Sequence, residues 1–145
     1  MKLNCNWKEK MVFSAAAAGN QVSMDAKSPI GGGTAMTPKE LVIAGLCGCT
    51  AMDVVALMKK YRQNLESFDI EADVSATEKG HPSVFTEAKL VFKFKGAVEP
   101  AKALEAVKLS QTQYCGVSAM LAKAFPIRYT VEVNGEVVGA GQAAF

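Results

Sequence analysis

The chain has one histidine, little net charge and no Cys-X-X-Cys pair, and each scarcity argues against a class of function. His81 lies in a Lys-Gly-His-Pro turn, where neither a Ser-His-Asp triad nor a conventional zinc site is convincing. A formal net charge of +2 over 145 residues, without basic and aromatic residues interleaved, argues against a nucleic-acid partner. The first ten residues contain no apolar segment typical of a signal peptide, so we expect a cytoplasmic protein.

Half of the residues are hydrophobic and about a fifth are charged, which is typical of a folded domain spanning residues 1–145. The longest apolar stretch, residues 41–58, is broken by glycines, a threonine and Asp53. It therefore predicts a buried core helix and no membrane span. The glycine run at 31–33 lacks the lysine of a phosphate-binding loop and is interpreted as a flexible loop.

Periodicity and turn residues predict strands on both sides of one long helix. Strands are expected within residues 2–25, with a tight turn at Gly19-Asn20. Thr37 as N-cap, Pro38 at N1 and Glu40 at N3 form a capping box, which starts a helix ending near residues 61–63. Further strands are expected at 68–77, 84–95, 127–133 and 136–138, and further helices at 100–113 and 117–124.

The middle of the long helix is apolar on every side, so it should be covered on every side. Ala44, Gly45, Gly48 and Ala51 give it a flat face that permits close approach of another helix. One modest sheet cannot cover such a helix alone, and the equivalent helix of a second copy is the natural cover. The sequence therefore predicts a homodimer.

Two cysteines far apart in the sequence are each placed at a helix. Cys49 lies within the long helix, and Cys115 directly precedes a short one. If their thiols meet, the chain carries a reversible dithiol that can accept and pass on two electrons. The alternative is that each cysteine is a small buried hydrophobe, and this interpretation is favoured most for Cys5 and Cys47.

Asp53 is the only charged residue inside the apolar stretch, four positions after Cys49 and on the same helix face. A buried carboxylate needs partners, so Asp53 either makes a structural hydrogen bond or helps to shape a thiol site. Cys47 and Cys49 are about 200° apart around the helix, which argues against a shared metal or disulfide. No cofactor is expected.

Several motifs resemble those of the OsmC/Ohr family, in particular its YhfA-like branch. They are Thr37-Pro38-Lys39-Glu40-Leu41, Cys49 followed by Asp53, Leu109-Ser110, Tyr114-Cys115 and Val117-Ser118. The resemblance covers nearly the whole chain. It implies an α+β, OsmC-like fold in which an antiparallel sheet wraps around a long central helix. It also implies an intertwined homodimer with active sites at the subunit interface.

Characterised members of this family reduce organic hydroperoxides, and the resemblance implies the same chemistry here. Cys49 would attack the peroxide and become a sulfenic acid, and Cys115 would resolve it to a disulfide. A dithiol reductant, which is a lipoylated protein in the Ohr branch, would then restore both thiols. Glu40 is the candidate third catalytic residue.

The sequence differs from the peroxidase pattern around the expected thiolate. The family's glutamate directly follows the proline, whereas here Lys39 does and Glu40 comes one place later. The family's arginine comes from the N-terminal strands, whereas the first arginine here is Arg62, so the cation would be Lys8, Lys10 or Lys60. The alternative is a non-enzymatic module that binds a small apolar ligand or senses oxidants, and a third is thiol transfer or exchange.

Overall fold

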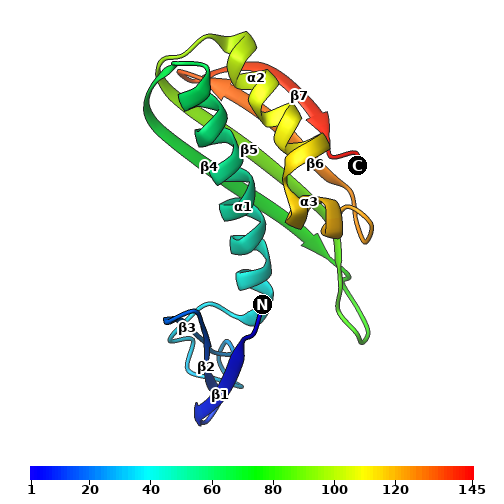
Figure 1. Ribbon diagram of the computed structural model, residues 1–145. Coiled ribbons are helices and arrows are strands. Elements are labelled where there is room, and N and C mark those ends of the chain that lie inside the picture. Colours follow the sequence, from blue (N-terminus) through cyan, green and yellow to red (C-terminus); the bar gives the residue numbers. More distant parts are fainter. The chain divides into compact units, whose positions relative to one another are not determined.

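Two β-sheets and one long helix account for most of the chain in the computed structural model, which describes residues 1–145 (Figure 1). The contacts divide the chain into two units, Met1–Gly45 and Leu46–Phe145. The N-terminal unit contains β1 (Asn4–Glu9), β2 (Val12–Ala17) and β3 (Asn20–Met24), paired antiparallel in that order. Helix α1 (Pro38–Lys60) begins in this unit and continues into the next.

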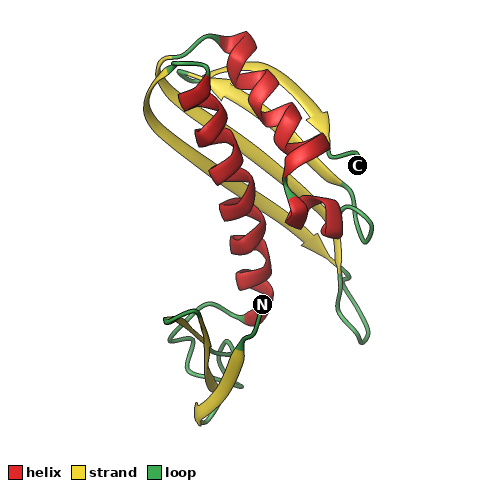
Figure 2. Ribbon diagram, viewed as in Figure 1, coloured by secondary structure: helices red, strands yellow, loops and turns green.

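The C-terminal unit packs its helices on one face of a four-stranded sheet (Figure 2). Its remaining elements are β4 (Asn64–Ala76), β5 (Phe85–Ala97), α2 (Pro100–Leu109), the π-helical turn η1 (Ser110–Tyr114), α3 (Gly116–Leu121), β6 (Ile127–Val133) and β7 (Glu136–Gln142). The strand order is β4-β5-β6-β7. The predicted α+β class is confirmed, and every predicted helix and strand is present. Strand β6 has the predicted bounds, and the other elements differ from prediction at one end or both.

The expected antiparallel pairing holds for every strand pair except β5–β6, which is parallel. Parallel neighbours need a long crossover connection, and here α2, η1 and α3 form it. The pattern of the single strands could not reveal this, because alternation fixes the face of each residue and not the direction of the neighbouring strand.

Alternation in β5 determines the core of the C-terminal unit. Ala88, Leu90, Phe92 and Phe94 are at most 1% exposed, as their period-two pattern predicts. They lie in one hydrophobic cluster with alternate residues of β6 and with the inward face of α1. Leu46, Val54, Leu57 and Met58 provide that face. The helix and the sheet therefore share a single core.

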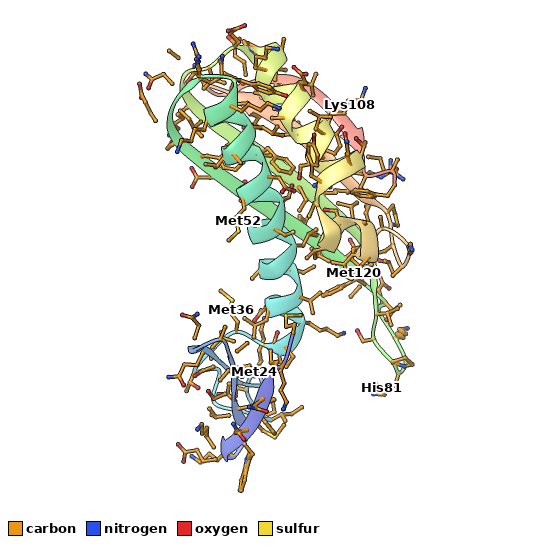
Figure 3. All side chains as sticks on the ribbon, in the orientation of Figure 1. Met24, Met36, Met52, His81, Lys108 and Met120 are labelled. Carbon is orange, nitrogen blue, oxygen red and sulfur yellow. The ribbon has the colours of Figure 1, made fainter.

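Within one chain, helix α1 is covered on one side only, which agrees with the expectation that one sheet cannot cover it alone. It is the one helix long and apolar enough to cross a membrane by length and composition, and 28% of its most apolar window is buried. Met52 is 76% exposed on the side of α1 turned away from α2 (Figure 3). The C-terminal unit has only one sheet face to offer, so it covers only one side of the helix.

The glycine run at 31–33 belongs to an ordered loop around a buried carboxylate, which the sequence did not reveal. Asp25 accepts hydrogen bonds from the backbone N–H groups of Ala26, Gly32 and Thr34 at 2.7, 3.2 and 3.0 Å, and from the Thr34 hydroxyl at 2.9 Å. These bonds, led by that from the Thr34 backbone, lower the pKa of Asp25. A Cβ atom on Gly31 would collide with the Ala26 carbonyl, so this close approach requires glycine.

The predicted capping box at the start of α1 is confirmed. The Thr37 N–H donates to Glu40 Oε2 at 2.8 Å, and the Glu40 N–H donates to Thr37 Oγ1 at 3.2 Å. Lys27 Nζ lies 2.6 Å from the other oxygen of Glu40. The hydrogen bond from Lys27, followed by that from the Thr37 backbone, lowers the pKa of Glu40 to about 2.

We predict that Glu40→Gln weakens the acid dependence of stability. A carboxyl group whose pKa is lowered by folding stabilises the native state above its unfolded pKa, and this contribution disappears as the pH falls towards about 2. The free energy of unfolding should therefore fall more for the parent than for Glu40→Gln between about pH 5 and pH 2. Urea unfolding at both pH values measures this, and equal losses for the two proteins would contradict it.

Candidate functional site

Cys115 lies at the junction of two helical segments, where the chain leaves the π-helical turn η1 and enters α3. Its backbone N–H donates to the Ser110 carbonyl at 2.9 Å, the i to i+5 bond typical of a π-helix. Its sulfur accepts a hydrogen bond from the Ser118 N–H at 3.3 Å and so caps α3. The sequence predicted this position before a helix start, but it predicted one α-helix where the structure has α2 followed by η1.

Burial controls the protonation of Cys115. The residue is 0% exposed, and desolvation raises the pKa of its thiol because the buried thiolate loses its water. The hydrogen bond that the Ser118 backbone N–H donates to the sulfur lowers this pKa but does not offset the effect of burial. The net shift of the Cys115 pKa is therefore upward, although the N–H group at the start of α3 acts in the opposite direction.

The thiols of Cys49 and Cys115 lie near enough to each other inside the C-terminal unit for one to influence the other. A side-chain hydrogen bond from Cys49 and the charge of a Cys49 thiolate both raise the pKa of Cys115. Cys49 is partly exposed on α1, whereas Cys115 is fully buried, and both are reduced. The fold thus joins the two cysteines that the sequence singled out, and it leaves only one of them open to solvent.

The other two cysteines lie in different surroundings. Cys47 is half-buried and packs against the hydrophobic core, where desolvation raises the pKa of its thiol. Cys5 is exposed on β1 in the N-terminal unit. No group of three or more histidine, cysteine or acidic side chains is arranged to hold a metal ion. His81 lies at the tip of the β4–β5 hairpin (Figure 3).

A chain of buried polar side chains runs alongside the two thiols. Thr50, Ser110 and Gln111 are each 0% exposed. Gln111 Nε2 donates to Thr50 Oγ1 at 2.7 Å, and the hydroxyls of Thr50 and Ser110 lie 2.7 Å apart. Ser110 Oγ donates to Asp53 Oδ2 at 3.0 Å, which is the partner that the sequence required for Asp53. The chain connects α1 to η1 directly.

Sequence reasoning missed Thr50 and Gln111 as members of this site. Their signal is a polar residue at a position that the helical pattern places in the core, since such a residue needs an internal partner. Thr50 interrupts the apolar stretch of α1, but a lone threonine in a helix can also satisfy its hydroxyl on its own backbone. Only the fold identifies the partner.

The remaining candidate residues lie elsewhere. Glu40 belongs to the N-terminal unit, where Thr37 and Lys27 engage its carboxylate, and its catalytic role stays a prediction. Lys60 is exposed at the end of α1, about 16 Å along the helix axis from Cys49 at 1.5 Å per residue. Lys60 of the same chain is therefore too far away to lie beside the Cys49 thiol. Lys8 and Lys10 are exposed residues of the N-terminal unit.

Comparison with known proteins yields one consistent family. A family model described as OsmC-like protein matches residues 31–130. Protein YhfA of Escherichia coli K12 is 34% identical over 135 residues, which cover 92% of this chain and 98% of that protein. A hypothetical protein from Aquifex aeolicus VF5 has the same fold, with a TM-score of 0.82, 24% identity, and coverage of 92% of this chain and 95% of that one.

An organic hydroperoxide resistance protein OsmC from Legionella pneumophila also shares the fold. The TM-score is 0.64 at 17% identity, and the match covers 91% of this chain and 94% of that one. These likenesses confirm the OsmC-like fold that the motifs of the sequence indicated.

Proposed function

The chain belongs to the OsmC-like protein family, and we propose that it is a thiol-dependent peroxidase that reduces organic hydroperoxides. One observation carries the proposal: a partly exposed thiol, Cys49, lies near a fully buried thiol, Cys115. The name of the Legionella protein that shares this fold supports the same substrate class.

The unequal exposure of the two sulfurs supports the roles that we propose for them. A bulky hydroperoxide can reach Cys49, whereas Cys115 has no exposed surface to offer it. The Cys49 thiolate attacks the terminal peroxide oxygen, the O–O bond breaks, and the alcohol leaves with a proton while Cys49 becomes a sulfenic acid. Cys115 then attacks that sulfur, the S–O bond breaks, and water leaves as the disulfide forms.

The disulfide must be reduced before a second turnover. A dithiol is the matching reductant, because it can open the Cys49–Cys115 bond through a mixed disulfide and close on itself. We propose a lipoylated protein in this role and a cytoplasmic location, where such reductants operate. Glu40 is proposed as a third catalytic residue that balances charge at the assembled site.

Each unit leaves apolar side chains exposed to solvent, which supports a homodimer as the active form. In the N-terminal sheet only Ser14 and Ala15 are buried, while Trp7 and Val22 are exposed. In the C-terminal unit, α1 presents an open apolar groove of about 390 Å³ lined by Ala51, Met52, Val55, Ala56 and Lys59. A second copy brings the same groove and can close it by two-fold symmetry.

The same groove is the observation that favours the alternative function. This apolar groove on the helix that carries Cys49 can hold a small apolar ligand, and the raised pKa of the buried Cys115 slows thiolate chemistry at that sulfur. A module that binds such a ligand or senses oxidants would keep the fold and the thiol pair without turnover. Steady-state kinetics separates the two functions.

We predict that one equivalent of cumene hydroperoxide links Cys49 to Cys115 and leaves Cys5 and Cys47 reduced. The proximity of the first two thiols favours their pairing, whereas Cys47 is packed in the core. Peptide mapping after alkylation of the free thiols identifies the bridge. A Cys47→Ser control should form the same bridge, and a bridge that contains Cys47 would contradict the assignment.

We predict that Cys49→Ser lowers the steady-state rate of cumene hydroperoxide reduction by about a hundredfold or more, as expected for loss of a nucleophile. Cys115→Ser should consume one equivalent and then stop, because its sulfenic acid has no resolving thiol. Cys47→Ser should keep the parental rate. Dithiothreitol-dependent peroxide consumption measures all three.

The pH dependence of the same assay follows from burial. Because its pKa is raised, the Cys115 thiol is mostly protonated at neutral pH, and only its thiolate attacks the sulfenic acid. The rate of disulfide formation in the parent should therefore increase as the pH rises from about 6 to 9. Parental turnover by Cys49→Ser would reject the peroxidase and leave the ligand-binding module in its place.

We predict that Val55→Glu weakens a dimer observed by sedimentation equilibrium, because it places a charge in the apolar groove of α1. The dissociation constant should rise about tenfold or more, which corresponds to about 1.4 kcal/mol. Val137→Glu is the matched control, since Val137 is 65% exposed on β7 and lies outside the groove. A monomeric parent at micromolar concentration, or equal effects of the two variants, would contradict the proposal.

A further inference from the structure

The hydrogen bonds between Gln111, Thr50, Ser110 and Asp53 run in one direction. Asp53 as a carboxylate only accepts, so Ser110 uses its one O–H on Asp53. The bond between the two hydroxyls must then be donated by Thr50 to Ser110. Gln111 donates its amide N–H to the Thr50 oxygen. Each hydroxyl thus donates once and accepts once, and one arrangement satisfies both.

The Thr50–Ser110 hydrogen bond is linked to both cysteines through the backbone. Thr50 directly follows Cys49 on α1, so the position of its hydroxyl fixes the adjacent turn of the helix. On the other side, the carbonyl of Ser110 accepts the N–H of Cys115 across the π-turn at 2.9 Å. The Ser110 hydroxyl is therefore attached to α1 while its carbonyl is attached to Cys115.

Apart from the two thiols themselves, four polar side chains link α1 to the crossover segment. The polar side chains that join the two segments are Thr50, Asp53, Ser110 and Gln111, and the surrounding contacts are apolar. Apolar packing is non-directional and permits small shifts, whereas a buried hydroxyl bond fixes distance and direction because breaking it leaves polar groups unsatisfied.

We propose that the Thr50–Ser110 hydrogen bond is a positioning device that sets the separation of the Cys49 and Cys115 sulfurs and thereby favours their disulfide. The inference rests on the proposed function only in taking this pair as redox-active. In a dithiol, disulfide formation becomes more favourable as the effective concentration of one thiol at the other increases. Thr50 and Ser110 are thus positioning residues, and neither touches the reacting atoms.

The tendency of Cys49 and Cys115 to form a disulfide can be measured without any hydroperoxide. In a Cys5→Ser, Cys47→Ser background only one pair of thiols remains. Oxidised dithiothreitol takes two electrons and two protons from that pair, which closes to a disulfide while the reagent becomes a dithiol. The fraction oxidised, read by alkylation at a series of ratios of oxidised to reduced dithiothreitol, gives the equilibrium constant for closing the Cys49–Cys115 bond.

Thr50→Val keeps the shape of the side chain and removes its hydroxyl. We expect it to lower this equilibrium constant about tenfold, which is about 30 mV towards a less negative potential. Thr50→Ser, which keeps the hydroxyl, should return the constant to within about twofold of the parent. Ser110→Ala should have the effect of Thr50→Val. If Thr50→Val does not fold, Ser110→Ala with the parent decides the question.

Ser14→Ala removes a buried hydroxyl from the N-terminal unit and should leave the constant unchanged. A role confined to stability would lower the melting temperatures of the reduced and oxidised forms equally and would not move the constant. An unchanged or increased constant in Thr50→Val and Ser110→Ala therefore overturns the proposal. Because the assay contains no peroxide, loss of the peroxidase function alone would not alter its result, and a negative result here would leave the peroxidase intact.

Discussion

The hydroxyls of Thr50 and Ser110 lie 2.7 Å apart in the interior, with Gln111 and Asp53 completing the chain at its two ends. This contact joins α1 to the crossover segment between β5 and β6, two parts of the chain that are distant in sequence. A buried hydroxyl without a partner costs about 1–3 kcal/mol, so the two segments are held in one register. The proximity of Cys49 to Cys115 depends on that register.

The π-helical turn explains how a helix can deliver a cysteine to this point. An α-helix continued past Leu109 would bond the N–H of residue 114 to Ser110, whereas here Cys115 makes that bond. The extra residue ends the helix and lets Cys115 adopt an extended backbone with φ −72° and ψ 102°. Its sulfur can therefore cap α3 while it remains near Cys49.

The chemistry of the site follows from unequal exposure of two similar groups. Cys115 is sealed from solvent and has a raised pKa, whereas Cys49 lies partly open on an apolar helix. Helix α1 of a monomer exposes much apolar surface to water, and each exposed apolar Å² is unfavourable by about 25 cal/mol of free energy. The proposed dimer would remove this cost and shelter the entrance to Cys49.

The sequence by itself determined the local features of this protein. The capping box of Thr37 and Glu40 and the buried alternation of β5 depend on residues within a few positions of one another. Such short-range bonds and periodicities are written directly in the order of the residues. The motifs around the two cysteines also sufficed to indicate the family.

Only the tertiary structure decided what those local features do together. It made β5 and β6 parallel, formed the loop around Asp25, and paired Thr50 with Ser110 and Gln111. It also determined the direction of the Cys115 pKa shift, because desolvation depends on everything that surrounds the thiol and not only on its neighbours in sequence. Burial and contacts between residues that are distant in sequence arise only when the chain folds, and the proximity of Cys49 to Cys115 results from both.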